Sequence, residues 1–245
     1  MRNKISFTTV IIFVALSVNA ELPSFFKQIE FAPQLGTDFG AAVPFPFGNV
    51  PSGSKSISPS LNITPALRFA YRFDNQWAIG FDPAYKTVGM DIQAKVTNQK
   101  FNDNGRLAYF TGISDIYMRY GMFELPLYCR FTLPNQKNRF MLGYYVAFWT
   151  YKRFDIKARK GFIGSVPDHV ESTVTGEGVD MEFTSYLRNM EHGLIAGYEH
   201  LFNDRLSAGV RLNVGVSDIF QPNIQYFDYS FIPLRVGFMV SYRLY

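Results

Sequence analysis

The sequence has very little of what builds disulfides, metal clusters and hydrolytic sites. Cys129 is the only cysteine among 245 residues, which excludes an intramolecular disulfide and any metal cluster made of cysteines. We interpret it as a small apolar side chain. The three histidines show none of the spacings typical of a metal site or of a nucleophile–base pair. We therefore expect no cofactor, no metal and no catalytic residues.

Long apolar runs are also missing after the first twenty residues. No later stretch approaches the ~20 apolar residues that a transmembrane helix needs. Residues 1–20 themselves have the features of a secretory signal peptide. Arg2 and Lys4 precede a short apolar stretch, and Val18-Asn19-Ala20 offers small residues for cleavage. We expect this segment to be removed during export.

Neither sign of charge dominates the chain. Lys and Arg number 24 and Asp and Glu 20, and without Arg2 and Lys4 the mature chain would hold 22 basic residues against 20 acidic ones. Charged residues make up 18% of the sequence, whereas hydrophobic residues make up 47%. A chain so nearly balanced gives no support for nucleic-acid binding, and we expect no nucleic-acid partner.

What the sequence does contain is alternation with a period of two, which is typical of β-strands. In the segment 205–220 the apolar residues Leu206, Val210 and Leu212 alternate with polar or small ones. No segment after residue 30 shows a helical period. We predict eight strands, at roughly 31–43, 63–73, 77–95, 115–133, 139–158, 182–202, 205–220 and 229–245.

The connectors between these segments alternate in length. Short turns are predicted at 74–76, 134–138 and 203–204, and polar loops at 44–62, 96–114, 159–181 and, shorter, 221–228. Outer-membrane barrels have this organisation, with short periplasmic turns and long extracellular loops. The predicted fold is therefore all-β: a single eight-stranded antiparallel up-and-down transmembrane β-barrel at 31–245, with a periplasmic lead-in at 21–30.

Two features of the predicted strands need an explanation. The segment 139–158 would extend about 45–50 Å along the barrel axis, against an apolar band of roughly 25 Å, so we expect the wall to rise above the outer surface. Pro65, Pro83, Pro126 and Pro233 fall inside predicted strands, where each removes a donor from the ladder. We expect bulges or exposed rim positions at these prolines.

The composition of the two strand faces indicates which one meets lipid. One face collects large apolar residues such as Phe140, Leu142 and Tyr144, and the other holds glycine, alanine and serine interrupted by charges. Small residues mixed with both signs of charge, and Arg preferred to Lys, indicate a crowded interior of paired groups. Since an eight-stranded barrel is filled by its own side chains, we predict a structural charge network in the lumen. Its predicted members are Arg68, Arg72, Asp82, Lys86, Glu124, Arg130, Arg153, Glu191, Glu199, Arg211, Arg235 and Arg243.

Two adjacent segments resemble a known family. They read YGMFELPLYCRFTL at 120–133 and RFMLGYYVAF at 139–148, and a polar turn separates them. Their Glu124-Leu125-Pro126-Leu127 motif and Gly143 are similar to a pattern in the PorT-like outer-membrane β-barrel family. The chain end resembles barrel-closing strands that finish on an aromatic, although Tyr245 falls on the predicted lumen face.

This resemblance implies a barrel fold and an outer-membrane location. The family has no shared catalytic residues, so the resemblance implies none in this chain. It also implies type IX protein secretion as one candidate process. We expect a monomeric, non-enzymatic protein of a Gram-negative outer membrane that acts through loop and rim contacts. Its expected partners are outer-membrane lipids and lipopolysaccharide, with other envelope or secretion proteins as further candidates. The alternatives are a component of type IX secretion, a small pore and a surface enzyme.

Overall fold

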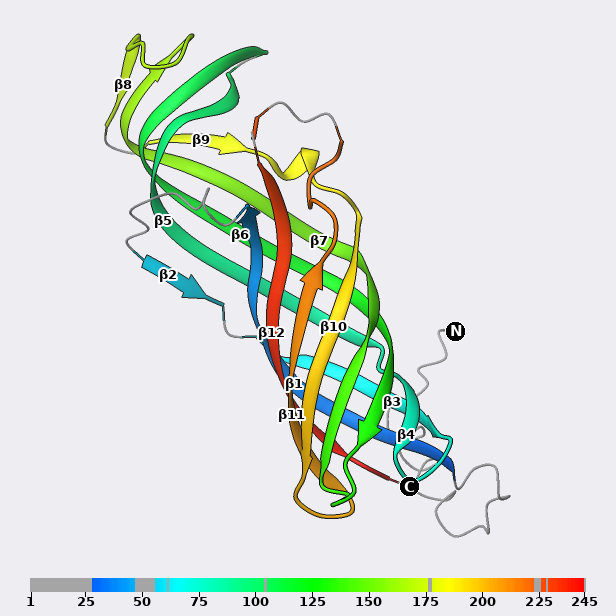
Figure 1. Cartoon of the computed structure of the whole chain (residues 1–245). Coiled ribbons are helices and arrows are strands. Elements are labelled where there is room, and N and C mark those ends of the chain that lie inside the picture. Colours follow the sequence, from blue (N-terminus) through cyan, green and yellow to red (C-terminus); the bar gives the residue numbers. More distant parts are fainter. Residues whose placement is uncertain are drawn as a thin grey trace, which may run out of the picture.

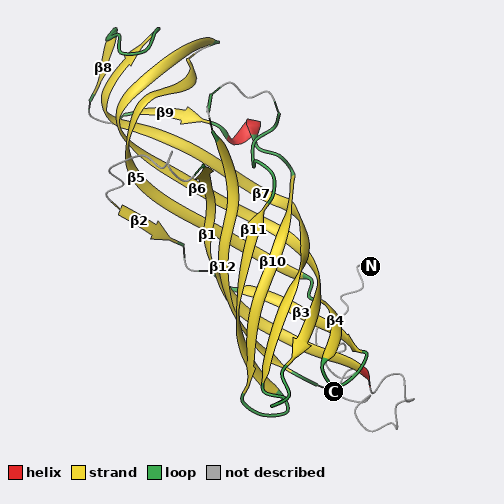
Figure 2. Ribbon diagram, viewed as in Figure 1, coloured by secondary structure: helices red, strands yellow, loops and turns green. Residues whose placement is uncertain are grey.

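The computed structural model describes residues 28–46, 56–60, 62–103, 105–175, 178–222, 226–227 and 229–244. The predicted signal peptide at 1–20, most of the predicted lead-in at 21–30, and Tyr245 lie outside these residues. Within them, no helix has the length and hydropathy that crossing a membrane requires. The described chain is almost entirely strand (Figures 1 and 2).

Eight antiparallel crossings close into a barrel, which confirms the predicted fold class. The first strand pairs with the third on one side and with the last on the other, so the ring has no open edge at the periplasmic end. The fourth and fifth strands share one crossing. In ring order the wall consists of β1 (Ile29–Phe45), β3 (Thr64–Arg72), β4 (Trp77–Phe81) with β5 (Ala84–Asp103), β6 (Arg106–Thr132), β7 (Asn138–Gly164), β10 (Met190–Leu201), β11 (Leu206–Gly215) and β12 (Ser230–Tyr242).

Shorter elements add to the wall at the end opposite the short turns. β2 (Ser56–Pro59) pairs with β5, and both β8 (Ser172–Val174) and β9 (Val179–Glu182) pair with β7. A 3₁₀ turn at Thr184–Tyr186 follows β9. Figure 1 shows the long ends of β5, β6 and β7 projecting past the other strands toward β8.

Two prolines explain why one crossing is divided into β4 and β5. The register is the same on both sides of the break, with Phe81 opposite Leu127 and Ala84 opposite Glu124. Pro83 and Pro126 therefore lie in the same short stretch of two neighbouring strands. The Asp82 N–H donates to the Pro126 carbonyl at 3.4 Å, but Pro126 has no N–H to return the bond. The expected bulge is absent here, and the ladder is interrupted without a shift of register.

Two of the segments that we predicted as long loops are largely strands, so these two predictions were wrong. Residues 96–114 continue β5 and β6 as one hairpin, in which Asp103 pairs with Arg106. Residues 159–164 extend β7, and part of the remainder folds back onto it as β8 and β9. The polar composition of these segments indicates water-exposed strands, because backbone groups above the membrane still form a ladder while their outer side chains face solvent.

Three other predicted strand ends also differ. β1 begins at Ile29, within the predicted lead-in. The segments at 182–189 and 216–220 leave the ring, and an isolated bridge between Leu187 and Phe220 and a hydrogen bond from the Arg188 side chain to the Phe220 carbonyl join them. Side chains and turns thus close the wall in this region, where strands were predicted.

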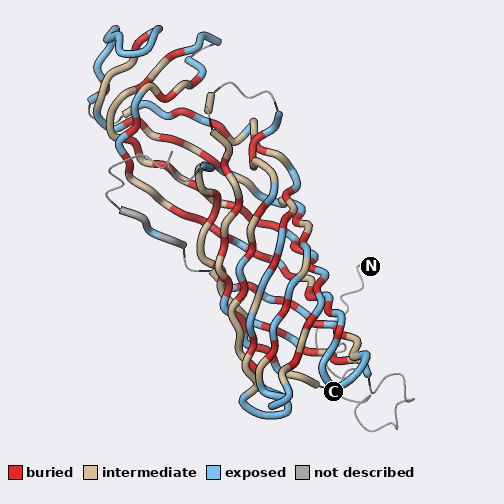
Figure 3. Tube along the Cα trace, in the orientation of Figure 1, coloured by how far each residue is buried: buried red, intermediate tan, exposed pale blue. Residues whose placement is uncertain are grey.

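The outer face of the lower barrel is apolar, as the alternation predicted. Leu127, Leu142, Leu194 and Phe238 are among its large side chains, and each is about half exposed. Buried and exposed positions alternate along these strands (Figure 3). A water-exposed surface would not carry so contiguous an apolar band, so this face meets the hydrocarbon of the membrane.

The two faces exchange their polarity along the wall. In the lower part of β6, Arg130 is buried in the lumen and Leu127 is exposed, whereas higher up Met118 is buried inside and Arg119 lies outside. We call this upper part, residues 88–103, 106–120 and 151–164, the rim. A barrel section in water must hide its apolar side inside, whereas a section in lipid turns it outward.

A β-bulge marks the same transition in β7. Trp149 and Tyr151 lie opposite adjacent residues of β6, so Thr150 is the extra residue of its strand. Because side chains alternate with a period of two, one extra residue exchanges the faces. The buried positions are therefore odd up to Ala147 and even from Phe154 to Ala158, after which a second register shift follows.

Candidate functional site

The lumen of the lower barrel holds charges of both signs in equal number. Among the described residues, six carboxylates and six cations are less than a tenth exposed. The carboxylates are Glu30, Asp38, Asp82, Glu124, Glu191 and Glu199, and the cations are Arg68, Lys86, Arg130, Arg139, Arg211 and Arg235. Buried charges need partners, and an equal number of each sign leaves no net charge to be compensated by ions or water.

The layer nearer the periplasmic turns centres on Arg68. Its guanidinium bonds Glu199 at 2.6 Å and Asp82 at 3.2 Å. Arg130 binds Glu30 with two parallel hydrogen bonds of 3.0 and 2.8 Å, the geometry in which a guanidinium fits a carboxylate best. The Arg68–Glu199 and Arg130–Glu30 contacts join strands that are not neighbours in the ring, so the layer ties the barrel together across its lumen.

Asp82 has a further role in this layer because it lies at the proline break. It accepts a hydrogen bond from the Tyr128 hydroxyl at 2.7 Å and is also bonded by Arg211. Arg211 lies 5.8 Å from the centre of the Tyr128 ring. The interrupted ladder thus places a carboxylate among three donors, which stabilise its charge inside the lumen.

The second layer lies closer to the rim. Lys86 bridges Asp38 at 2.8 Å and Glu124 at 2.9 Å. Arg235 contacts Glu124 at 3.2 Å and also pairs with Glu191. Each carboxylate of this layer therefore faces at least one cation, and the two layers together fill the cross-section of the lower lumen.

Nine of the twelve residues predicted for the network are buried in the lumen. They are Arg68, Asp82, Lys86, Glu124, Arg130, Glu191, Glu199, Arg211 and Arg235. Arg72 and Arg243 are half-buried at the periplasmic ends of β3 and β12. Arg153 was wrongly placed inside, since its side chain is 59% exposed and pairs with Asp155 on the outer face. The Thr150 bulge is the reason, because it reverses the faces of β7 before residue 153 is reached.

Three members of the network were missed in the sequence. Glu30 was assigned to the lead-in, although it shares the even phase of Ala32 and Gln34. Asp38 follows in the same phase. Arg139 stands two residues before Met141 on the lumen face of β7. Extending the predicted strand at 31–43 by one residue identifies Glu30, whereas Arg139 already begins the predicted strand at 139–158 and is identified by the phase it shares with Met141.

Above the charges, the interior becomes apolar. Val88, Met122 and Phe154 begin a core that continues into the rim. Aromatic rings from the connecting segments close over it, with Phe220 and Phe227 stacked 4.9 Å apart and Phe231 5.0 Å from Phe227. The upper interior is therefore packed as the core of a soluble domain would be.

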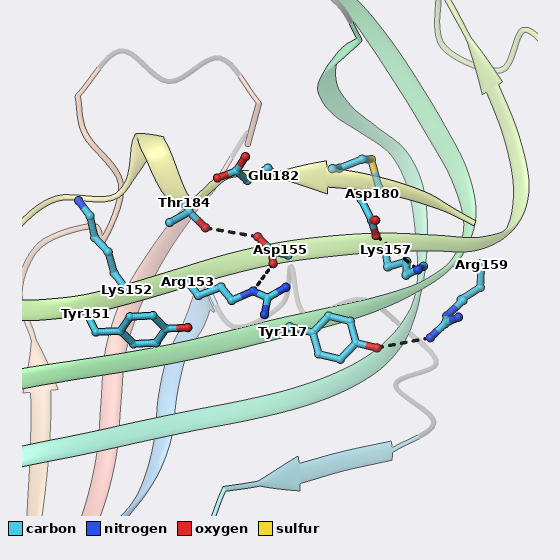
Figure 4. Close-up of a pocket in the computed structure, with 11 residues that line it drawn as sticks. Tyr117, Tyr151, Lys152, Arg153, Asp155, Lys157, Arg159, Asp180, Glu182 and Thr184 are labelled. Atoms are coloured by element: carbon cyan, nitrogen blue, oxygen red, sulfur yellow. Dashed lines mark hydrogen bonds and ion pairs between the residues drawn. The ribbon is translucent and has the colours of Figure 1, made fainter. Parts of the chain in front are cut away.

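A hollow of about 700 Å³ lies on the outer face of the rim, between β6, β7 and β9 (Figure 4). Its wall carries charges of both signs, and several are paired. Arg153 bonds Asp155, Lys157 lies 3.7 Å from Asp180, and Arg159 donates to Asp115 at 2.6 Å beside the hollow. The hollow is lined by Tyr117, Tyr151, Lys152, Arg153, Asp155, Lys157, Arg159, Asp180, Met181, Glu182 and Thr184.

Among the ionisable groups at or beside this hollow, Asp115 and Lys152 have pKa values below their ordinary ones. Burial raises the pKa of Asp115, but hydrogen bonds from Gln93 and Arg159 outweigh it and hold the pKa below its usual value. Partial burial lowers the pKa of Lys152, whose ammonium donates to the Leu187 carbonyl at 2.7 Å. Within the described ranges, no group of three or more His, Cys, Asp or Glu side chains is placed to hold a metal ion. The hollow is thus a polar surface suited to contact.

Comparison with known proteins gives one match to a family and several distant structural neighbours. The family model described as outer membrane protein beta-barrel domain matches residues 16–221. Ail of Yersinia pestis is similar at 11% identity and a TM-score of 0.38, over 88% of this chain and 98% of that chain. OprG of Pseudomonas aeruginosa is similar at 10% identity and a TM-score of 0.36, over 88% and 96%. No curated protein matches the sequence.

Proposed function

This chain belongs to the outer membrane protein beta-barrel domain family, and from that premise we propose that it is a non-enzymatic envelope protein acting through its rim and loops. Its barrel is that of a Gram-negative outer-membrane protein. The observation that carries the proposal is the charged hollow on the outer face of the rim, directly above the lipid-facing band. Anchoring in lipid does not require such a surface, whereas binding a polar partner does.

The position of the hollow suggests which partners it contacts. Phe148 and Tyr151 are about half exposed at the top of the apolar band, and Arg153 follows on the same outer face. Lipopolysaccharide presents phosphates and sugars at this height, and guanidinium groups bind phosphate well. Envelope or secreted proteins with charges of both signs fit the hollow equally well. We propose lipopolysaccharide as the constant neighbour and a protein as the functional partner, with the barrel itself a monomer.

Two features support a contact role over a pore or an enzyme. Charged side chains fill the lower lumen in two layers, which leaves ions no evident path. The paired groups of the rim hollow are bonded to one another and do not present a nucleophile beside a base. A small pore and a surface enzyme therefore stay as secondary alternatives.

Type IX secretion is the process that the family motif favours as an alternative. Glu124 of that motif binds Lys86 and Arg235 in the lumen, and Pro126 lies opposite the Asp82–Pro83 break. Both motif residues thus have structural roles, so the motif supports a PorT-like barrel without locating a secretion surface. We also propose that residues 1–20 are a cleaved signal peptide and that a short lead-in ends before Ile29.

The contact role can be tested by site-specific photo-crosslinking in the native bacterium. A photo-reactive residue in place of Arg153 should give adducts with lipopolysaccharide and with a discrete protein. The same residue in place of Phe148, on the lipid face of the same strand, is the matched control and should give lipid adducts only. Identical adducts from the two positions would reject a specific rim contact.

The secretion alternative needs a separate measurement. Proteins released into the medium should be compared between the native strain, a deletion strain and a strain complemented with the intact gene. Selective loss of secreted proteins on deletion, restored by the gene, would establish the secretion role. An unchanged profile would exclude it and leave the contact role to the crosslinking test.

A further inference from the structure

A second cavity, separate from the charged hollow, lies inside the wall at the base of the rim. Its volume is about 140 Å³, and it lies between β1, β5 and β6 with aromatic residues before and within β12 above it. Ala42 and Ala94 are almost fully buried in its wall, and Met90 and Met118 contribute flexible side chains. An engineered apolar cavity of about 150 Å³ in another protein is known to stay dry and to bind benzene. The cavity therefore has room for a small apolar group.

The lining offers such a group few polar partners, since only Gln99 and Tyr229 carry polar side-chain atoms. Gln99 is its only amide side chain, and the amide nitrogen already donates to the carbonyls of Lys100 and Tyr226, each at 3.0 Å. All other described residues of the lining are aliphatic, methionine, proline or aromatic, and none is charged. A charged or strongly polar ligand would lose its hydration here without compensation. The lining selects for uncharged hydrocarbon, and the methionines can adapt to its shape.

The cavity lies beside a seam in the barrel wall. β1 pairs with β3 only as far as Gly36, and beyond it the described pairings give β1 no strand neighbour except β12. The Asn62 carboxamide binds both the N–H and the carbonyl of Asp38, at 3.1 and 2.9 Å, and so ends the ladder. On the far side of the seam, the described pairings give this edge of β5 only Ala66 of β3 at its start and the short strand β2. The residues facing the cavity from β1, at 42–44, thus lie next to a gap in the hydrogen-bonded wall.

The outer surface on the β1 side of this seam is apolar. Leu35, just below the end of the β1–β3 pairing, is 57% exposed, Ile63 beside the start of the seam 68%, and Phe45 at the end of β1 50%. The lipid-facing band continues up to these side chains. A hydrocarbon chain in the membrane can therefore reach the β1 side of the seam without first entering water.

We propose that this cavity binds the end of an acyl chain of an outer-membrane lipid, which enters laterally between β1 and the edge formed by β2 and β5. The site would hold a lipid against the base of the rim. The inference rests on the cavity and the seam and is independent of the partners proposed for the charged hollow.

Photolabelling from the membrane tests the site. The protein is reconstituted in phosphatidylcholine vesicles that contain a phospholipid with a diazirine at the end of one acyl chain. After irradiation, adducts are located residue by residue with mass spectrometry. We expect adducts on the inward residues Met90 and Met118 in addition to lipid-face residues such as Leu142, which serves as the internal standard.

Filling the cavity should remove only the inner adducts. Ala94→Phe is expected to lower inner labelling about tenfold relative to Leu142, which corresponds to about 1.4 kcal/mol of binding. Val179→Phe on β9, outside the cavity, is the matched control and should leave labelling unchanged. If Ala94→Phe does not fold, Met118→Trp fills the same space from the opposite strand.

Two outcomes would overturn the proposal. Absence of inner adducts in the unaltered protein would mean that the cavity holds no acyl chain. Inner labelling by a free phenyl diazirine, but not by the lipid probe, would mean that the site takes small apolar molecules and that the seam does not admit lipid. Neither outcome affects the crosslinking test at Arg153.

Discussion

At the residue scale, the lumen depends on carboxylates that face more than one cation. Glu124 contacts Lys86 at 2.9 Å and Arg235 at 3.2 Å, and it accepts a hydrogen bond from Asn213 at 3.0 Å. Two cations lose a partner if this carboxylate is removed. Paired charges can be buried at modest cost, but a charge left without its partner inside a protein is strongly destabilising.

Glu124→Ala is therefore expected to lower the free energy of unfolding by about 3–5 kcal/mol. Urea unfolding in phosphatidylcholine vesicles would measure it. Glu182→Ala, which removes an exposed carboxylate of β9, is the control and should change stability by about 0.5 kcal/mol or less. Equal stability of Glu124→Ala and the unaltered protein would contradict a cooperative network.

A second residue-scale feature is the packing of Tyr128 between two glycines. Gly80 and Gly143 are its partners on the two neighbouring strands. A Cβ at Gly80 would lie 2.3 Å from Cζ of the tyrosine ring, and one at Gly143 would lie 2.2 Å from the Leu127 carbonyl oxygen. The phenol thus occupies space that only glycine leaves free, and this position brings its hydroxyl to Asp82.

Gly80→Ala is expected to displace the tyrosine ring and to destabilise the barrel by about 1–3 kcal/mol, the usual cost of overpacking. The shift should be visible as a lower urea midpoint. Gly121→Ala is the control, because a Cβ there would lie 3.1 Å from the Tyr85 hydroxyl, 3.2 Å from Thr150 Oγ1 and 3.5 Å from Tyr151 Cβ, without the severe overlap found at Gly80. If the two variants are equally stable, Tyr128 does not need the space above Gly80.

At the element scale, the Thr150 bulge decides which face of β7 meets water. Deleting Thr150 shifts every later residue of the strand by one position and would turn the buried side chains of the rim outward. Residue 153 would then move to an inward position. In a Cys129→Ala background, Arg153→Cys should react readily with a membrane-impermeant maleimide, and deletion of Thr150 should largely abolish that reaction.

Persistent labelling after the deletion would mean that a new bulge forms elsewhere and that Thr150 itself is dispensable. Lys157→Cys extends the test, because residue 157 lies on the same outer phase above the bulge. Its labelling should fall together with that of residue 153 if the upper strand turns as a unit.

A second element-scale prediction concerns the pairing of β6 with β7 in the rim. Asp115 accepts hydrogen bonds from Gln93 at 2.9 Å and from Arg159 at 2.6 Å. Its pKa is lowered, so this contribution to stability is present above the unfolded-state pKa of about 3.9 and is lost as the pH falls through the lower folded-state value. Titration followed by ¹³C NMR of labelled aspartate should give a pKa below the ordinary value.

Arg159→Ala should raise that pKa toward the ordinary value, because the one charged donor among the three side chains that bond Asp115 is removed. Lys160→Ala, a neighbouring exposed cation, is the control and should have little effect. Titration of Asp115 at its ordinary pKa in the unaltered protein would contradict the proposed contacts.

At the scale of the whole molecule, a filled lumen predicts a barrel that does not conduct ions. Two layers of paired charges cross the interior, and the apolar core closes the space above them. In planar lipid bilayers we expect no steady conductance from the purified protein, with a wide porin measured alongside as the positive control. A stable unit conductance in most insertions would contradict the closed lumen and favour the small-pore alternative.

Much of this barrel architecture can be predicted from the sequence because the alternation of apolar and polar residues has a direct physical cause. Successive side chains on a strand point to opposite faces, so Leu206, Val210 and Leu212 indicate one apolar face whatever surrounds the strand. The number of crossings followed from the alternating segments and the turns between them. Nine lumen charges could be named for the same reason, since each keeps the phase of its strand.

Only the tertiary structure decided where the inward-facing positions of a strand change from odd to even residues, and which charged side chains contact one another. A bulge such as Thr150 depends on the register of two strands, and a single strand carries no record of that register. The ion pair between Arg68 and Glu199 joins residues 131 positions apart, so only closure of the ring brings them together. The apolar lining of the upper cavity and the charged outer face opposite it arise because the barrel leaves the membrane within its own strands. The same alternation of side chains occurs in lipid and in water, and only the folded chain shows where the wall passes from lipid into water.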